Sequence, residues 1–212
     1  MNIFYLSDTP RLAAKDHCDK HVVKMILEYA QLLSTAHRVL DGDEWADKNK
    51  LYKATHKNHP SAVWARDNKI NYLWLWELLS FCCEEYTKRY NKVHATQRKG
   101  LVDTLRRVPN NITMDKVWSF REGDRVLPGS FTRPPQCMPD EYKCDDTIKA
   151  YRDYYLGEKI SFAKWNYSKT PDWFLQGVSD RVKYDEEKLN DYLKDSHWAI
   201  PSQKSLKKGN RI

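Results

Sequence analysis

Five polar side chains recur at alternating spacings of four and three residues near the start of the chain. They are His17, His21, Lys24, Glu28 and Gln31, here called the polar stripe. At roughly 100° per residue, side chains at these spacings lie on one face of a helix. Their neighbours are largely apolar, so we expect the stripe to face a cleft rather than bulk water. Imidazole, amine and carboxylate groups in a partly desolvated cleft are suited to acid–base or Schiff-base chemistry.

His17, His21, Lys24 and Glu28 are therefore the candidate catalytic residues, and Gln31 is a candidate substrate-binding residue. An amine is nucleophilic only when it is neutral, which burial favours and a nearby carboxylate opposes. We expect Lys24 to act either as a Schiff-base nucleophile or, if Glu28 keeps it charged, as a clamp for a phosphate or oxyanion. A structural interpretation also stays open, in which these side chains only pair with one another across one helical turn.

Two further segments carry side chains that suit ligand binding. One immediately precedes a predicted helix, where unpaired backbone N–H groups can bind a phosphate. The other is long, rich in proline and also rich in arginine. Either segment has a simpler interpretation, the first as a solvated turn and the second as a belt around a helical core. The candidate substrate-binding residues in these segments are Asn58, His59, Arg121, Arg125, Arg133 and Tyr142.

Basic residues interleaved with aromatic residues suggest a nucleic-acid-binding surface. Cations at such a surface contact phosphates while aromatic rings stack on exposed bases. Aromatic residues are equally expected in the core of a helical protein, so packing is the alternative explanation. The candidate nucleic-acid-binding residues are Lys88, Arg89, Lys92, Arg98, Lys99, Arg106 and Arg107.

A metal site is not expected. His17 and His21 have the spacing of a helical metal-binding pair, but no Glu follows His17 as in the zinc-protease motif. Lys24 in the same stripe would also repel a cation. No sequence feature calls for a cofactor.

Two long helices must position these residues. Thr9 followed by Pro10 predicts a helix start, and Gly42 predicts its end near residue 40. A second helix is predicted from about 61 to 90. Shorter helices are predicted at 98–107 and 145–164, and residues 3–6 should form a short extended segment.

The sequence predicts the all-α class, as a single helical domain with two long central helices and a proline-rich extended insertion. Glycine is scarce, with 7 residues in 212, and helix-forming residues dominate the long segments. The expected parts of the domain are a helical core at 1–108, a long loop at 109–144, C-terminal helices at 145–200 and a flexible basic tail at 201–212.

The charge and the cysteine content indicate the kind of partner and the cellular compartment to expect. A formal net charge of +7 fits a polyanionic partner, for which DNA is the expected candidate. Five cysteines without paired spacing, and a start that does not look like a signal peptide, indicate reduced thiols in the cytoplasm. No stretch is apolar enough to span a membrane, so no membrane partner is expected.

Four short motifs of the sequence resemble those of a group of uncharacterised phage-encoded proteins. They lie at residues 19–25, 30–38, 58–60 and 138–142. This resemblance spans most of the chain and implies a protein that works in the cytoplasm of an infected host cell. It implies no particular activity.

The first hundred or so residues also resemble small all-helical pyrimidine-dimer glycosylases with abasic-site lyase activity. The resemblance rests on Leu12 and Ala13, on His17, and on the short motifs at 58–60 and 89–91. It implies that an N-terminal amine attacks the sugar with help from a helix glutamate. In this chain Lys24 stands near the expected glutamate, and Glu28 follows one turn later.

The sequence hypothesis is a DNA-acting phage-type enzyme, a DNA glycosylase or glycosylase-lyase for a damaged or modified base. Such chemistry requires a flipped nucleotide and a pocket with charged groups at its floor. Two alternatives stay open: a phage DNA-base modification enzyme, and a non-enzymatic factor that binds DNA or a host protein.

Overall fold

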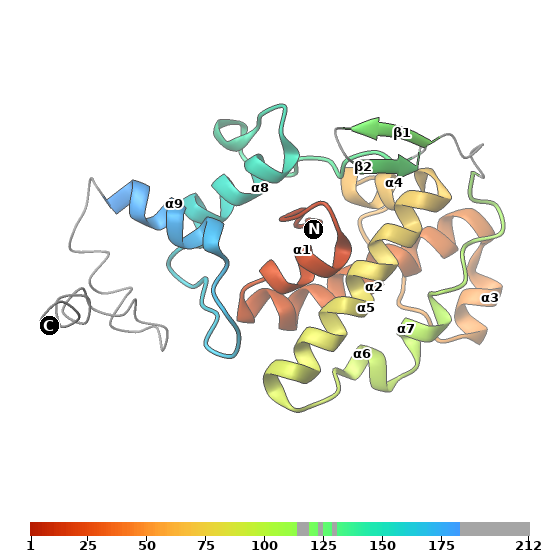
Figure 1. The fold of residues 1–212 in the computed structure, drawn as a ribbon. Helices are drawn as coiled ribbons and strands as arrows, with labels where there is room; N and C mark the ends of the chain where they lie inside the picture. Colours follow the sequence, from red (N-terminus) through yellow and green to blue (C-terminus); the bar gives the residue numbers. More distant parts are fainter. Residues whose placement is uncertain (114–118, 123–124, 129–130, 183–212) are drawn as a thin grey trace, which may run out of the picture.

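The computed structural model describes residues 1–113, 119–122, 125–128 and 131–182 (Figure 1). Nearly all of its elements are helical, which confirms the all-α class. The predicted tail at 201–212 lies outside the described residues. The helices are α1 (Pro10–Asp16), α2 (Asp19–Asp41), α3 (Asp43–Lys48), α4 (Pro60–Asp67), α5 (Lys69–Tyr90), α6 (Ala95–Arg98), α7 (Leu101–Thr104), the 3-10 turn η1 (Asp140–Tyr142), α8 (Thr147–Tyr154), the π-helical turn η2 (Tyr155–Lys159) and α9 (Asp172–Val182).

The first predicted helix is two helices. Thr9 caps α1 and Pro10 opens it, and Gly42 ends α2, as the sequence predicts. The backbone is extended at His17 and Cys18, however, which separates α1 from α2. Arg89 of α5 stabilises this break, because its guanidinium donates to the carbonyl oxygens of Lys15 (2.9 Å) and His17 (2.8 Å). A distant side chain thus replaces helical hydrogen bonds at the end of α1.

The second predicted helix is divided in the same way. Asn68 is extended and separates α4 from α5, and its side-chain oxygen accepts a hydrogen bond from the backbone N–H of Asn71 at 2.9 Å. This is an N-cap, for which asparagine is among the preferred residues. Of the helix predicted at 98–107, only α7 (Leu101–Thr104) forms; α6 ends at Arg98, and Gly100, whose φ is +75°, lies between the two helices.

The core lies where α2 packs against α4 and α5, with α1 against α5. The N-terminal segment runs between this core and α8 (Figure 1). Residues 3–6 are buried there without forming a strand. The Phe4 N–H donates to the hydroxyl of Tyr29 (3.4 Å), and Arg152 of α8 donates to the carbonyl of Leu6 (2.9 Å). The segment is therefore fixed on both sides.

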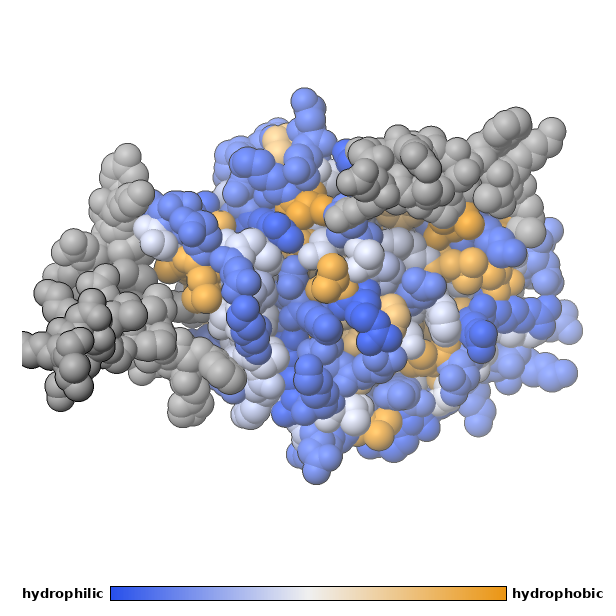
Figure 2. Space-filling model, in the orientation of Figure 1, coloured by the Kyte–Doolittle hydropathy of each residue, from blue (hydrophilic) through white to orange (hydrophobic). Residues whose placement is uncertain are grey.

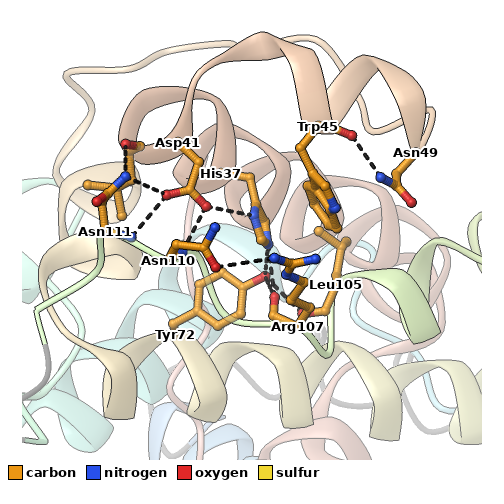
Figure 3. Close-up of polar contacts among 10 residues, drawn as sticks. His37, Asp41, Trp45, Asn49, Tyr72, Leu105, Arg107, Asn110 and Asn111 are labelled. Carbon is orange, nitrogen blue, oxygen red and sulfur yellow. Dashed lines mark hydrogen bonds and ion pairs between the residues drawn. The ribbon is translucent and has the colours of Figure 1, made fainter.

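A polar cluster holds the far end of α2 (Figure 3). The carboxylate of Asp41 accepts the backbone N–H groups of Asn110 (2.8 Å) and Asn111 (3.0 Å). His37 stacks on Trp45, with their ring centroids 4.7 Å apart. The Nε2 of His37 contacts the Arg107 carbonyl at 2.9 Å. These contacts tie the chain after α7 to the end of α2.

The proline-rich segment is partly a hairpin and partly a belt. Strands β1 (Ser119–Glu122) and β2 (Arg125–Pro128) pair antiparallel, where the sequence predicted no strand. After them, Thr132 and Phe131 contact the core: the Trp64 indole donates to the Thr132 carbonyl (3.0 Å), and Phe131 packs on Trp74. Packing on the helical core is what the belt interpretation expected.

Hydrophilic residues cover most of the described surface in the view of Figure 2, and apolar side chains occur in separate groups. None of the helices in the described ranges has the length and apolarity that a membrane crossing requires.

Candidate functional site

A cleft of about 440 Å³ lies between the N-terminal segment, the first half of α2 and the chain around η2. We call it the N-terminal cleft. Its volume falls within the range of small-molecule pockets, roughly 300–1,000 Å³. It is lined by Met1, Asn2, Phe4, Lys20, His21, Lys24, Met25, Glu28, Tyr154, Lys159 and Phe162.

Three members of the polar stripe meet in this cleft. His21, Lys24 and Glu28 follow one another at spacings of three and four on α2, so their side chains share one face of the helix. The cleft also has aromatic walls, made by Phe4, Tyr154 and other rings. The sequence-based prediction of a cleft at this face therefore agrees with the structure for these three residues.

His17 does not belong to the cleft. It lies in the break between α1 and α2, fully buried, with Nδ1 2.6 Å from the carbonyl of Ala13 and Nε2 2.7 Å from the hydroxyl of Tyr29. Burial lowers the pKa of His17 to about 4, and the positive charge of Arg89 also lowers it. Both ring nitrogens are occupied and no substrate can reach them, so the prediction of a catalytic His17 is wrong.

His21 is nearly buried at the inner wall of the N-terminal cleft. Its ring stacks on Phe4 with centroids 4.4 Å apart, and its Nδ1 forms a short hydrogen bond with the hydroxyl of Tyr155. Burial lowers the pKa of His21 to about 2, and the positive charges of Lys159 and Lys24 contribute in the same direction. The imidazole is therefore neutral at ordinary pH.

Lys24 and Glu28 form an ion pair across one turn of α2. The Lys24 Nζ lies 3.3 Å from a Glu28 carboxylate oxygen. The Lys24 side chain is 69% exposed and that of Glu28 only 17%. An exposed amine beside a carboxylate favours the ammonium form, which suits a clamp better than a nucleophile. Glu28 is the less exposed partner and therefore the better placed of the two for proton transfer.

His59 lines a neighbouring cleft of about 500 Å³, which shares Tyr154 with the first. We call it the His59 cleft. His59 caps α4, since its Nδ1 accepts the backbone N–H of Ser61 at 3.2 Å. Burial lowers the pKa of His59, the positive amino terminus lowers it further, and Glu28 opposes both. The amino terminus and Glu28 are thus close enough to His59 to affect its pKa.

The other candidate substrate-binding residues are dispersed. Asn58 and Arg133 are exposed, and neither they nor Gln31 line either cleft. Tyr142 packs on Tyr154 with centroids 5.5 Å apart and donates to Glu158 at 3.2 Å, so it supports the aromatic wall from outside. The side chains of Arg121 and Arg125 lie outside the described part of the structure.

Arg89 must be removed from the candidate nucleic-acid-binding residues. Its side chain is 0% exposed and forms ion pairs with Glu85 (3.0 Å) and Asp19 (3.2 Å). Its role is to hold the break between α1 and α2, as described above. The sequence does not distinguish this buried arginine from the exposed basic residues near it, because all of them stand in the same basic and aromatic segment.

The remaining basic candidates are all exposed. Lys88 pairs with Glu85 at 3.6 Å, and Arg106 and Arg107 lie over the rings of Trp76 and Trp45. These contacts leave the cations at the surface, where they can still meet a phosphate. The exposed candidates are Lys88, Lys92, Arg98, Lys99, Arg106 and Arg107.

The structure adds cleft residues that the sequence did not single out. Lys20 lies over the ring of Phe162 (5.1 Å) and Lys159 over that of Tyr154 (4.4 Å). Lys20 adjoins the polar stripe, so its position gave a weak signal. Residues 154–162 gave none, because only the packing of α8 and η2 on the N-terminal segment brings them to α2.

The N-terminal cleft thus combines amines, one carboxylate, a neutral imidazole and aromatic walls. This combination can bind an anion, stack on a planar ring and form a covalent bond through an amine. Comparison of the chain with family models, curated proteins and solved structures finds no match. The clefts themselves are therefore the features from which a function can be inferred.

Proposed function

We propose that this protein is a DNA-acting enzyme, a glycosylase or glycosylase-lyase that removes a damaged or modified base. The observation that carries the proposal is the meeting of an amine-bearing α2 face, Glu28 and aromatic rings in one cleft of about 440 Å³. A flipped nucleotide requires a pocket of this kind, with rings to stack on the base and polar groups for the sugar.

The proposed reaction begins with attack of a neutral amine on C1′ of the deoxyribose. The C1′–N bond to the base breaks, its electron pair leaves with the base, and the base takes up a proton. The amine loses its own proton to Glu28. The C1′–O4′ bond of the sugar then breaks as the nitrogen lone pair forms the C=N bond of a Schiff base, and O4′ keeps the electron pair and takes up a proton. Water then releases the sugar, or elimination of the 3′ phosphate completes a lyase reaction.

Two amines are candidates for the nucleophile. One is the Nζ of Lys24, and the other is the amino group of Met1 in a chain that begins at this residue. The exposure of Lys24 and its ion pair with Glu28 favour a charged clamp. Met1 also lines the cleft, and its carbonyl accepts from Ser61 (3.3 Å), which fixes it beside α4.

The non-enzymatic alternative has one observation in its favour. Lys24 and Glu28 pair with each other, and His17 only satisfies polar groups of the core. A factor that binds DNA or a host protein would need no more than this. A DNA-base modification enzyme would use the same cleft but transfer a group instead of releasing the base.

Borohydride trapping tests the proposal. The chain is incubated with duplexes that contain an abasic site, an ultraviolet lesion or a hypermodified base, and sodium borohydride is added. We expect a covalent protein–DNA adduct, because borohydride reduces a Schiff base to a stable amine. Mass spectrometry of the digested adduct maps the residue, and released bases are measured in parallel without borohydride.

Variants of both amines assign the nucleophile. An adduct that Lys24→Ala abolishes and that survives blocking of the α-amine makes Lys24 the nucleophile. An adduct on Met1 transfers that role to the α-amine. Lys48→Ala, an exposed lysine of α3, is the matched control and should trap normally. If no duplex gives an adduct and none releases a base, the proposal is overturned in favour of a binding factor.

A further inference from the structure

The ring of His21 is held in one orientation by its neighbours. Phe4 stacks on its face, while Tyr155 and Phe162 meet it edge-on, with centroids at 5.0 and 5.6 Å. The hydrogen bond between the Tyr155 hydroxyl and Nδ1 fixes the rotation of the ring. The other ring nitrogen, Nε2, has no partner among the described residues, and His21 lines the N-terminal cleft.

The hydrogen bond to Tyr155 also fixes the tautomer. A phenol hydroxyl donates far more readily to an imidazole nitrogen than to the weak acceptor offered by the nearby Cys18 thiol. Nδ1 is then the acceptor, and the single ring proton lies on Nε2. His21 consequently presents an N–H donor, rather than a basic lone pair, toward the cleft.

The cleft carries an excess of positive charge. Lys20, Lys24 and Lys159 line it, and Glu28 is the one carboxylate among its lining residues. Lys20 and Lys159 are each held over an aromatic ring of the cleft wall. Their ammonium groups therefore stay at the cleft, and an anionic ligand with several acceptor oxygens matches this arrangement.

We propose that the N-terminal cleft binds a phosphate group, and that His21 donates its Nε2–H to a phosphate oxygen as a neutral imidazole oriented by Tyr155. The inference rests on the proposed function, in which the phosphate belongs to the DNA backbone beside the target nucleotide. It gives His21 the role of a binding residue and not of a proton carrier. Tyr155 is a positioning residue, because it acts through His21.

The charge around His21 agrees with this role. The groups that face it are His17, Lys24 and Lys159, all basic, and the hydroxyl of Tyr155, whose pKa burial raises. Burial is the main cause that lowers the pKa of His21 to about 2, and the ammonium groups of Lys159 and Lys24 contribute in the same direction. The Nε2–H donor of neutral His21 is therefore present from pH 8 to pH 5.

Nuclear magnetic resonance of protein labelled with ¹⁵N-histidine tests the inference directly. We expect the His21 ring to show the pattern of the Nε2–H tautomer, without conversion to imidazolium from pH 8 to pH 5. Inorganic phosphate should shift its Nε2 resonance in a saturable way. Tyr155→Phe, which keeps the ring, should weaken phosphate binding about fivefold and mix the tautomers. Tyr52→Phe, far from the cleft, is the matched control.

The wild-type spectra decide the matter even if a variant does not fold. An Nδ1–H tautomer, an imidazolium forming near pH 6, or a His21 resonance that phosphate leaves unmoved would each overturn the inference. None of these results depends on catalysis. A trapped Schiff base together with any of them would keep the proposed function and remove only the role of His21.

Discussion

At the scale of single residues, burial and partners separate histidines that look alike in the sequence. His17 is a core residue, His21 faces a cleft, and His59 caps a helix. All three have a lowered pKa with burial as the main cause. A lowered pKa therefore does not identify a functional histidine here, and access to the cleft does.

His17 makes a prediction about stability. Its pKa is about 4 in the folded chain and about 6.5 in the unfolded chain, so the unfolded state takes up the proton first as pH falls. The stabilisation from neutral His17 is complete above about pH 6.5 and is lost as pH falls toward 4. Between pH 7.5 and 5.0 this loss amounts to about 2 kcal/mol.

Urea unfolding at a series of pH values checks this prediction. His17→Gln should reduce the change in unfolding free energy between pH 7.5 and 5.0 by about 2 kcal/mol relative to the wild type. The exposed His56 provides the control, and His56→Gln should leave the pH dependence as it is. Equal pH dependence in the wild type and His17→Gln would contradict the assignment of His17 to the core.

At the scale of elements, the ends of helices follow local sequence while the breaks within them do not always do so. Asn68 carries its own capping side chain, so the division of α4 from α5 has a local cause. The break at His17 and Cys18 has none, because Cys18 forms no side-chain cap and Arg89 supplies the hydrogen bonds. Because of this break, His17 does not share the helical face of His21, Lys24 and Glu28.

The prediction at this scale concerns the stability effect of replacing two glycines that lie between helices. Gly42, between α2 and α3, has φ +84° and ψ −176°, a region that only glycine adopts readily. Gly100 has φ +75° and ψ 6°, which asparagine also tolerates. A Cβ would meet nothing within 4 Å at either site, so backbone strain alone separates them.

Gly42→Asn should therefore lower the free energy of unfolding by about 1–3 kcal/mol. Gly100→Asn should lower it by roughly 1 kcal/mol or less. Denaturant unfolding of both variants at one pH measures the difference. A loss at Gly100 as large as that at Gly42 would mean that the conformation of Gly42 is not the cause.

At the scale of the whole molecule, the N-terminal cleft is a product of three distant segments. The first residues of the chain, the face of α2 and the turn after α8 meet only when the core has formed. The exposed basic candidates at 88–107 do not line the N-terminal cleft, so a DNA duplex has two candidate sets of cationic contacts. Salt dependence distinguishes them.

The proposed phosphate contacts predict the salt dependence of DNA binding. Each phosphate contact adds about 0.9 to the slope of log K against log salt concentration for duplex DNA. The double variant Lys24→Gln and Lys159→Gln should therefore reduce the magnitude of the slope by about 2. Fluorescence anisotropy with a labelled duplex at several salt concentrations measures it.

A charge-matched variant provides the control. Lys48→Gln and Lys50→Gln remove the same charge from the exposed end of α3 and should leave the slope within about 0.5 of the wild type. Equal slopes for the two double variants would show that net charge, rather than the N-terminal cleft, governs binding.

The sequence by itself determined the helical class, the start of α1, the end of α2 and the shared face of His21, Lys24 and Glu28. These features are local, since caps, glycine conformations and helical periodicity act within a few residues. It also pointed to a cleft, because the polar stripe is flanked by apolar residues on the same helix.

Only the tertiary structure decided which residues share that cleft and which are buried. Arg89 and His17 became core residues because two chain segments about 70 positions apart satisfy each other's polar groups. Lys159 and Tyr154 entered the cleft because α8 packs on the N-terminal segment. Such pairings depend on the three-dimensional arrangement of separate helices, and neither composition nor periodicity within one helix contains that information.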